Sequence, residues 1–316
     1  MGRSVGTDYL LLLININKVR KNWLHLILRC AGLIIITVLL IKAFVATSCS
    51  IPSSGMENSL YKGERVLVNK WSYGLRLPFS TARIGKGCPS KGEIVLFNNP
   101  NPRHGDTPVY RREVFISRCI GTPGDTLMLS DDLLVTNEQI FSPDSKALYL
   151  YPFEGDSIIS DALNRLEIDN NSLTGYQEGM LMRSFSYYEY YLLQQELKGK
   201  LNLTRINQAE SKAYPFIIPT KGFTVKVYPW NINLICNTIS RHEGKRATVR
   251  DHQLYVDGFP VTAYTFTQNY YWMASNTPVN IYDSRLFGLV PETHLIGRAS
   301  LIWYSPKKGR TFNRVQ

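Results

Sequence analysis

The chain has 316 residues, of which 44% are apolar and 19% are charged, and its formal net charge is +11 at pH 7. This length and composition suit one large or two ordinary folded domains, and they exclude a disordered chain. The five cysteines are odd in number and contain no Cys-x-x-Cys pair, so neither a zinc site nor a disulfide framework is indicated, although a single bridge stays open. We expect no cofactor and no metal.

Basic residues gather around an apolar run near the N-terminus. Up to residue 42 the one acidic residue is Asp8, and the basic residues are Arg3, Lys18, Arg20, Lys21, Arg29 and Lys42. Basic residues beside an apolar run indicate membrane topology rather than DNA binding. We therefore expect membrane lipid, and no nucleic acid, among the partners.

The apolar run is CAGLIIITVLLI, residues 30–41. It is shorter than the roughly 20 residues of a membrane span. The flanking sequence is also largely apolar, however, and the side chains of Arg29 and Lys42 are long enough to reach the two interfaces. We predict a single-pass transmembrane helix at 23–48 in the cell (inner) membrane, with a cytoplasmic basic tail at 1–22 and the bulk of the chain extracytoplasmic (periplasmic).

Three alternatives to a membrane span are open. A buried core helix does not account for the basic flanks. A cleaved signal peptide, or a lipoprotein signal that ends at ATSC with Cys49 acylated, conflicts with the position of Lys42 just before the small residues. The earlier run YLLLLININ (9–17) is too short to span, and it predicts an interfacial helix or a membrane-adjacent tail.

After Ser50 the sequence consists mostly of short alternating or β-branched runs that are broken by Gly, Pro and Asn. Such runs stand at 65–74, 93–102, 114–125, 126–137, 222–229, 252–266 and 294–305. Their spacing predicts a mainly β body of curved antiparallel hairpins rather than βαβ units.

One stretch interrupts this pattern. Residues 152–211 are rich in Tyr, Asn, Leu and Glu, and SFSYYEYYLLQQELKGKL (184–201) favours a helix. We predict an inserted, partly helical cap at 152–211, within a β domain made of residues 49–151 and 212–316.

Four segments of the chain form an ordered set of motifs. They are IPSSGMENSLYKGERVLVNKWSYG (51–74), KGEIVLFNNP (91–100), VFISRCIGTPGD (114–125) and YYWMASNTPVNIYDSRLFGLVPETHLIGRA (270–299). In this order they resemble the sequence boxes of the bacterial type I signal peptidases, also called leader peptidases, which are membrane-bound Ser/Lys proteases that remove signal peptides from exported proteins. The resemblance implies a signal-peptidase-type β body with a membrane anchor, and signal peptides or exported preproteins as partners.

The first box departs from the family at its nucleophile. The family reads Pro-Ser-x-Ser-Met there, and its second Ser attacks the substrate; Pro52 and Met56 align without a gap, which puts Gly55 at that position. Ser53 matches a position that helps to stabilise the oxyanion in part of the family, although a Ser here is equally a turn residue. Ser54 is expected to point to the other side of an extended loop, because successive side chains alternate.

The third box departs at the general base. The family has Tyr-Ile-Lys-Arg, and the matching residues are Phe115, Ile116, Ser117 and Arg118. In a Ser/Lys dyad, an apolar site lowers the pKa of the Lys from about 10.4, so that the neutral amine can take the hydroxyl proton. The hydroxyl of Ser117 is too weakly basic and too short for that task. Arg118 keeps the register and is expected to support the site.

The last box also departs from the family at a residue that supports catalysis. The family reads Gly-Asp-Asn-Arg-x-Asn-Ser-x-Asp-Ser-Arg, and this chain reads SNTPVNIYDSR (275–285). Asp283, Ser284 and Arg285 are retained, and in the family they form a scaffold beside the site. The Ser that hydrogen-bonds the catalytic Lys in the family is replaced by Ile281.

The substitutions predict a catalytically defective signal peptidase homologue, a pseudoenzyme. An extended peptide can still dock on a strand edge, because that mode uses backbone hydrogen bonds and needs no nucleophile. Such a protein would bind, sequester or present export substrates, or would partner an active signal peptidase. Two alternatives are an active serine-type endopeptidase with a non-standard nucleophile, and a structural envelope protein without peptide binding.

Overall fold

The computed structural model describes most of the chain after the first 22 residues. The described residues are 23, 25–77, 80–85, 87–102, 105, 107–130, 144–168, 171, 173–206, 212–278 and 282–315. The predicted cytoplasmic tail, the run at 9–17 and the side chain of Ile281 lie outside them.

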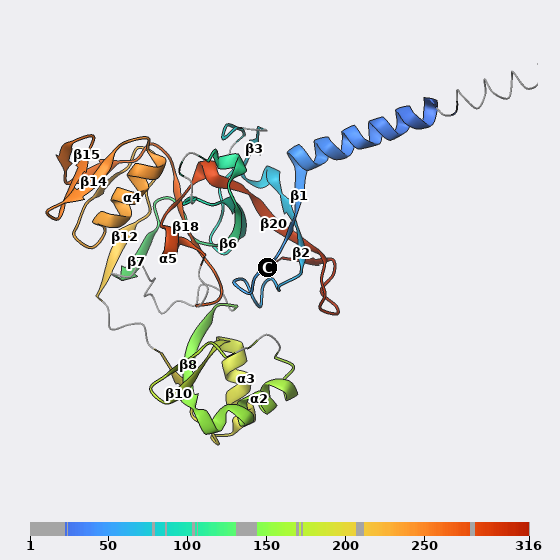
Figure 1. Ribbon diagram of the computed structural model, residues 1–316, viewed down its shortest axis with the longest axis vertical. Coiled ribbons are helices and arrows are strands. Elements are labelled where there is room, and N and C mark those ends of the chain that lie inside the picture. The colour runs from blue at the N-terminus through green and yellow to red at the C-terminus, as the bar shows by residue number, and fades with distance from the viewer. Residues whose placement is uncertain are drawn as a thin grey trace, which may run out of the picture.

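An apolar helix precedes the β body. Residues 25–40 are α-helical, and a π-helical turn, η1 (Ile41–Val45), follows them. Most of the large apolar side chains of this helix are exposed, and the helix projects away from the rest of the molecule (Figure 1). In the part of the chain that the structure describes, no helix combines the length and the apolar character that a bilayer crossing requires. Residues 25–40 are thus helical as expected, but the helix predicted at 23–48 ends earlier, because Ala46–Ser50 form a strand. The membrane crossing stays a prediction.

An eight-stranded antiparallel sheet forms the centre of the body, and it curls around its core (Figure 1). Its strands follow the order β1–β2–β20–β5–β6–β18–β19, and β21 pairs with β20. Their bounds are β1 (Ala46–Ser50), β2 (Arg65–Asn69), β20 (Leu295–Tyr304), β5 (Ile94–Asn98), β6 (Val114–Gly121), β18 (Tyr270–Ala274), β19 (Val290–Pro291) and β21 (Asn313–Arg314).

The alternation of apolar residues explains these strands. In β2, Val66 and Val68 are buried while the residues at both ends are exposed, as expected for a strand near the edge of a sheet. Every residue of β5 is buried, because this strand lies between β20 and β6. The mainly β prediction is therefore confirmed, and β2, β5, β6 and β20 lie within predicted runs.

The two faces of the sheet contribute to different apolar clusters. Val95 and Phe97 of β5 pack with Cys119 and Met273 in one cluster. Ile94 belongs to the other, with Ile51, Met56, Leu60, Val66, Ala299 and Ile302. This second cluster includes residues of the loop between β1 and β2, so the core itself holds that loop in place.

A second group of elements packs on Trp272 and its neighbours in a third cluster. It contains β7 (Thr126–Ser130), β12 (Ala213–Ile217), β13 (Thr224–Lys226), α4 (Ile232–His242), β14 (Ala247–Arg250), β15 (Gln253–Val256), β16 (Phe259–Val261) and β17 (Ala263–Thr265). The sequence analysis did not predict α4. Its signal was present, because Ile232, Ile235 and Ile239 recur at helical spacing and are all buried.

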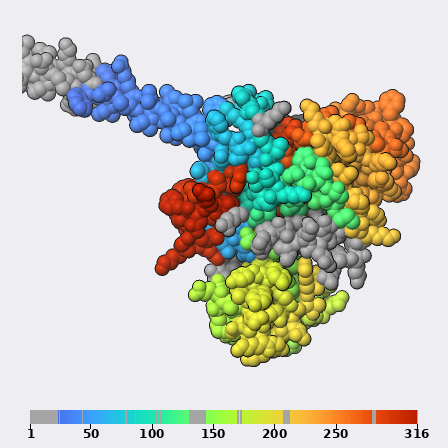
Figure 2. All heavy atoms as spheres, turned by 180° about the vertical axis from the view of Figure 1, so that it is seen from behind, coloured from blue at the N-terminus to red at the C-terminus, as the bar shows by residue number. Residues whose placement is uncertain are grey.

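The inserted region forms a separate lobe (Figures 1 and 2). Its sheet has the order β11–β8–β10–β9, and two helices pack on it. The elements are β8 (Lys146–Pro152), α2 (Asp156–Arg165), β9 (Gly175–Gln177), β10 (Met180–Ser186), α3 (Tyr187–Leu197) and β11 (Thr204–Arg205). The sheet thus begins at Lys146, whereas the predicted insertion begins at 152. Ser186 and Glu189 form a capping box that starts α3 within the segment expected to be helical.

Short elements complete the body. Two of them, η2 (Lys70–Tyr73) and β3 (Leu75–Arg76), follow β2 directly. The others are β4 (Arg83–Ile84), η3 (Val109–Arg111), η4 (Phe153–Gly155), α5 (Ser284–Phe287) and η5 (Glu292–His294).

Candidate active site

The loop that joins β1 to β2 contains the predicted nucleophile position. Two backbone hydrogen bonds close its base, from Ile51 N to Glu64 O (2.9 Å) and from Gly63 N to Ile51 O (2.8 Å). Met56 and Leu60 are buried, and Leu60 N donates to Met56 O (2.7 Å). The loop is therefore a compact turn fixed by its own apolar residues.

Gly55 adopts a backbone conformation that other residues can adopt, since its φ does not lie in the left-handed region. A Cβ built on Gly55 would lie 3.7 Å from Ser53 Oγ and 3.9 Å from Ser275 Cβ, which are ordinary van der Waals distances. Neither the backbone nor the packing therefore requires glycine here. A Cβ at this position would therefore meet neither backbone strain nor a steric clash.

The neighbouring serines differ in exposure. Ser53 is exposed, and its hydroxyl lies on the side to which a side chain at position 55 would point. Ser54 is half-buried, and its carbonyl accepts a hydrogen bond from Glu57 N (3.0 Å). The chain bends at 53–54 and turns from 55 on, so the strand alternation used to orient Ser54 does not apply in this loop.

The segment after β18 holds Gly55 from the other side. The carbonyl of Gly55 accepts hydrogen bonds from Asn276 N (2.9 Å) and Thr277 N (3.2 Å). The side-chain amide of Asn276 donates to Glu57 O (3.0 Å) and to Ser59 Oγ (2.8 Å). Asn276 is buried, so one side chain ties the first and last boxes together inside the protein.

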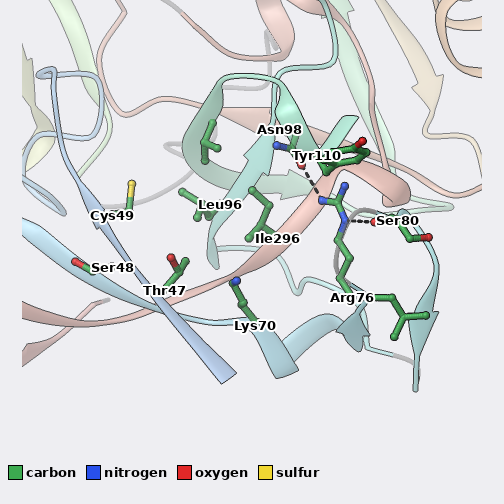
Figure 3. Close-up of a pocket in the computed structure, with 12 residues that line it drawn as sticks. Thr47, Ser48, Cys49, Lys70, Arg76, Ser80, Leu96, Asn98, Tyr110 and Ile296 are labelled. Carbon is green, nitrogen blue, oxygen red and sulfur yellow. Dashed lines mark hydrogen bonds between the residues drawn. The ribbon is translucent and has the colours of Figure 1, made fainter. Parts of the chain in front are cut away.

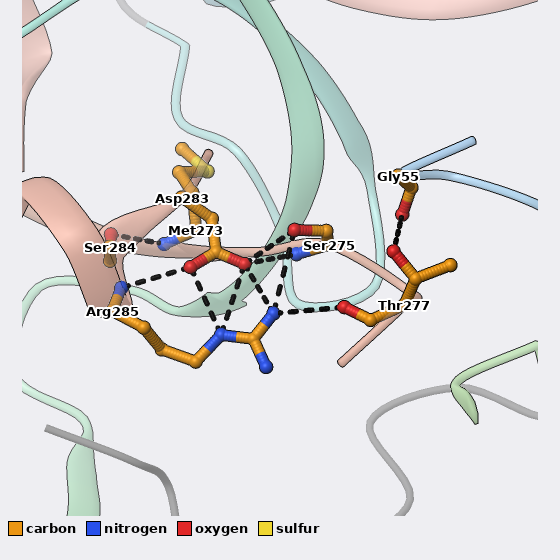
Figure 4. A network of polar contacts seen from close by, with 7 residues as sticks. All are labelled: Gly55, Met273, Ser275, Thr277, Asp283, Ser284 and Arg285. Carbon is orange, nitrogen blue, oxygen red and sulfur yellow. Dashed lines mark hydrogen bonds and ion pairs between the residues drawn. The ribbon is translucent and has the colours of Figure 1, made fainter. Parts of the chain in front are cut away.

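A buried ion pair positions that segment (Figure 4). The Asp283 carboxylate is fully buried and accepts hydrogen bonds from Ser275 N (2.7 Å), Ser275 Oγ (2.6 Å) and Arg285 Nη2 (2.6 Å). The hydroxyl of Ser284 accepts from Met273 N (2.9 Å), and Arg285 Nη2 also donates to Thr277 O (3.3 Å). Asp283, Ser284 and Arg285 thus hold the backbone that in turn holds Gly55.

Ser117 lies in the middle of β6, opposite Val95 of β5, and only 1% of it is exposed. By alternation it shares a face of the strand with Phe115 and Cys119. Phe115 stacks on Tyr282, with ring centroids 5.9 Å apart. The predicted base position is therefore enclosed by apolar and aromatic neighbours, which is the environment that lowers the pKa of an amine.

Arg118 connects β6 to the loop between β1 and β2. Its guanidinium donates from Nη1 to Gly92 O (2.6 Å) and from Nη2 to Ser59 Oγ (2.7 Å). The Ser59 hydroxyl donates to the carboxylate of Asp144, which lies 3.6 Å from Arg118 Nη2. Burial lowers the pKa of Arg118, and Asp144 opposes that shift.

A buried lysine links the cap to the same loop. Lys146 Nζ lies 3.3 Å from Glu57 Oε2 and 3.8 Å from Glu189 Oε1, and only 1% of the Lys146 side chain is exposed. Burial raises the pKa of Glu57, and the Lys146 charge opposes that shift. The amine of Lys146 is therefore engaged by two carboxylates inside the protein. The sequence analysis missed this group, because no local pattern relates residues 57, 146 and 189.

A pocket of about 340 Å³ lies along β1 (Figure 3). Its walls include consecutive β1 residues from Thr47 to Cys49, as well as Leu96, Val114 and Ile296. We call it the β1 pocket. The sequence analysis did not predict it, because its walls come from segments far apart in the chain.

Comparisons with known proteins match this chain to one family. The sequence profile described as "Signal peptidase, peptidase S26" matches residues 21–191. A signal peptidase I of Buchnera aphidicola subsp. Schizaphis graminum is 26% identical over 272 residues, which cover 86% of this chain and 72% of the relative. Signal peptidase I of Pseudomonas aeruginosa is 23% identical, with 89% and 75% covered, and that of Aquifex aeolicus is 22% identical, with 87% and 82% covered. The profile match spans more than half of the chain, and the chain belongs to the signal peptidase family, peptidase S26.

Proposed function

We propose that this chain is a catalytically defective signal peptidase homologue that binds extended segments of exported preproteins without cleaving them. The observation that carries the proposal is Gly55. Gly55 occupies the predicted nucleophile position in a loop that backbone hydrogen bonds hold in place. A Cβ at this position would make only ordinary van der Waals contacts. This arrangement supports a nucleophile loop that has lost its nucleophile.

The contacts around the predicted base position support the same proposal. Ser117 provides a hydroxyl in an enclosed site where a dyad requires an amine. Of the lysines that the structure describes, Lys146 alone is buried, and its amine is engaged by Glu57 and Glu189. Lys91, near the second box, is more than half exposed and pairs with Asp125 (2.9 Å). These contacts disfavour the alternative of an active enzyme with a different base.

The sheet edge supports peptide binding over a purely structural role. Among the described strands, β1 pairs with β2 alone and leaves its other edge open beside the β1 pocket. An extended peptide can add to such an edge through backbone hydrogen bonds, while alternate side chains enter the pocket. This mode needs neither a nucleophile nor a base.

Restoring the missing groups tests the catalytic part of the proposal. We expect Gly55→Ser and Ser117→Lys to be inactive singly and the double variant to recover little cleavage, because Ile281 offers no hydrogen bond to orient the new amine. Adding Ile281→Ser is expected to give a measurable gain over the double variant. The measurement is the rate of precursor-peptide cleavage by all variants under one condition.

Ser117→Met in the Gly55→Ser background is the matched control, because methionine fills a similar length of the buried site without an amine. It separates the effect of the amine from the cost of overpacking, which is about 1–3 kcal/mol in a well-packed core. Full activity in the Gly55→Ser single variant would reveal another base, and it would refute the proposed loss of both catalytic groups.

A further inference from the structure

The β1 pocket has a positively charged wall. Its lining includes Lys70 and Arg76, and no acidic residue is present among the described residues that line it. The other described residues of the wall are uncharged, and they include residues of β1, β5, β6 and β20. A pocket of this composition favours a ligand that carries negative charge.

The guanidinium of Arg76 uses only part of its hydrogen-bonding capacity (Figure 3). Its Nε donates to Ser80 O (2.9 Å), and its Nη1 donates to Asn98 Oδ1 (2.7 Å). Its Nη2 is buried and has no hydrogen-bond partner among the described residues. Burial lowers the pKa of Arg76 to about 10, and the charge of Arg83 adds to the shift, so the side chain remains a cation at neutral pH. A desolvated cationic donor without a partner is costly unless a ligand supplies an acceptor.

Lys70 adds to the positive potential of the pocket. Its Nζ donates to the carbonyl of Lys42, at the end of the N-terminal helix (2.8 Å). Burial lowers the pKa of Lys70, and the charges of Arg76 and Lys42 lower it further. These charges therefore repel one another, and an anion in the pocket would relieve that repulsion.

The open edge of β1 indicates the form of the ligand. Thr47, Ser48 and Cys49 all line the pocket, although side chains of consecutive strand residues point to opposite faces. The hydroxyl of Ser48 accepts a hydrogen bond from Trp303 Nε1 (2.8 Å). A strand edge beside a pocket suits an extended peptide that pairs with the edge and places a side chain in the pocket.

We propose that the β1 pocket selects peptides with an acidic side chain, whose carboxylate accepts hydrogen bonds from Arg76 and interacts with the charge of Lys70. The inference rests on the proposed peptide-binding function, and it adds the ligand's charge. A hydrogen bond between charged groups corresponds to roughly a tenfold to hundredfold difference in affinity against a neutral isostere.

The test uses the full chain in neutral detergent and labelled nine-residue peptides of Ala, Ser and Thr. A single Glu is moved through the nine positions, and each peptide has a Gln and a Lys counterpart; dissociation constants are measured by fluorescence anisotropy. At the best position we expect the Glu peptide to bind about tenfold more tightly than the Gln peptide and the Lys peptide to bind most weakly. The preference is expected to shrink as salt is raised.

Two variants assign the preference to the pocket. Arg76→Gln is expected to reduce the difference between the affinities for the Glu and Gln peptides to less than threefold. Measurable binding of the Gln peptide by this variant shows that the β1 pocket is folded. Arg250→Gln is the matched control, because Arg250 is an exposed arginine of β14 outside the pocket. It is expected to leave the preference intact.

The outcomes separate this inference from the function on which it rests. Equal binding of Glu and Gln peptides would overturn the acidic preference and leave peptide binding in place. No binding of any peptide would overturn the proposed function itself. If a short-chain phosphatidylglycerol binds at Arg76 and no Glu preference exists, the pocket is a lipid headgroup site and the inference is wrong.

Discussion

The full-length protein is expected to process a signal-peptide precursor about 10⁶ times more slowly than an active signal peptidase assayed beside it. Loss of the nucleophile or of its base costs about this factor in a serine protease, and the two losses do not add because the groups act as one unit. Among the described residues, the buried Lys146 amine faces two carboxylates, and Asp283 is engaged by Ser275 and Arg285. The product is quantified by mass spectrometry.

Ser54→Ala is the control for this prediction. Ser54 is the serine next to Gly55, and it is half-buried in the same loop. Cleavage at the normal site that disappears in Ser54→Ala would assign the nucleophile to Ser54. The chain would then be an active peptidase with a shifted nucleophile, contrary to the proposal.

Lys146→Met is expected to destabilise the junction between the cap and the loop that carries Gly55. Removing one partner of a buried ion pair costs about 3 kcal/mol, because the remaining charge stays in the interior without compensation. The loss is measured as the free energy of opening of β8 by amide hydrogen exchange. The pKa of Glu57 is already raised by burial, so in the variant it takes up a proton more readily. The difference from the wild type is therefore largest at neutral pH and narrows as the pH falls toward 4.5, the ordinary value for Glu.

Lys245→Met is the matched control, because Lys245 pairs with Asp257 (2.8 Å) at a site where both side chains are well exposed. A surface pair of this kind contributes little. We expect no measurable change from this variant. An equally small effect of Lys146→Met would show that the buried group does not hold the cap to the loop.

The strands of the main sheet could be predicted because their signal is local. Val66 and Val68 alternate with polar residues in β2, and the strand periodicity follows directly. In contrast, α4 was missed although Ile232, Ile235 and Ile239 are spaced as on a helix, since the sequence analysis read the surrounding region for strands. The order of the strands could not be predicted, because β20 inserts between β2 and β5 from the far end of the chain.

The candidate site divides in the same way. Alignment of the boxes assigns position 55 to the family's nucleophile and position 117 to its general base, and this assignment stays a prediction. The sequence could not predict which residues contact these two positions. The hydrogen bond from Asn276 N to the carbonyl of Gly55 and the ion pair of Lys146 with Glu57 join residues far apart in sequence. Contacts of this kind depend on the folded chain rather than on any local pattern.

Native mass spectrometry of the full-length protein with a precursor peptide in slight deficit tests the central claim most directly, because one spectrum reports binding and cleavage together. The account predicts a one-to-one complex that contains the precursor at its intact mass, with no mature or signal-peptide fragment after prolonged incubation. An active signal peptidase treated in parallel should release both fragments. Fragments in the sample of this protein, or the absence of any complex with intact precursor, would contradict the account.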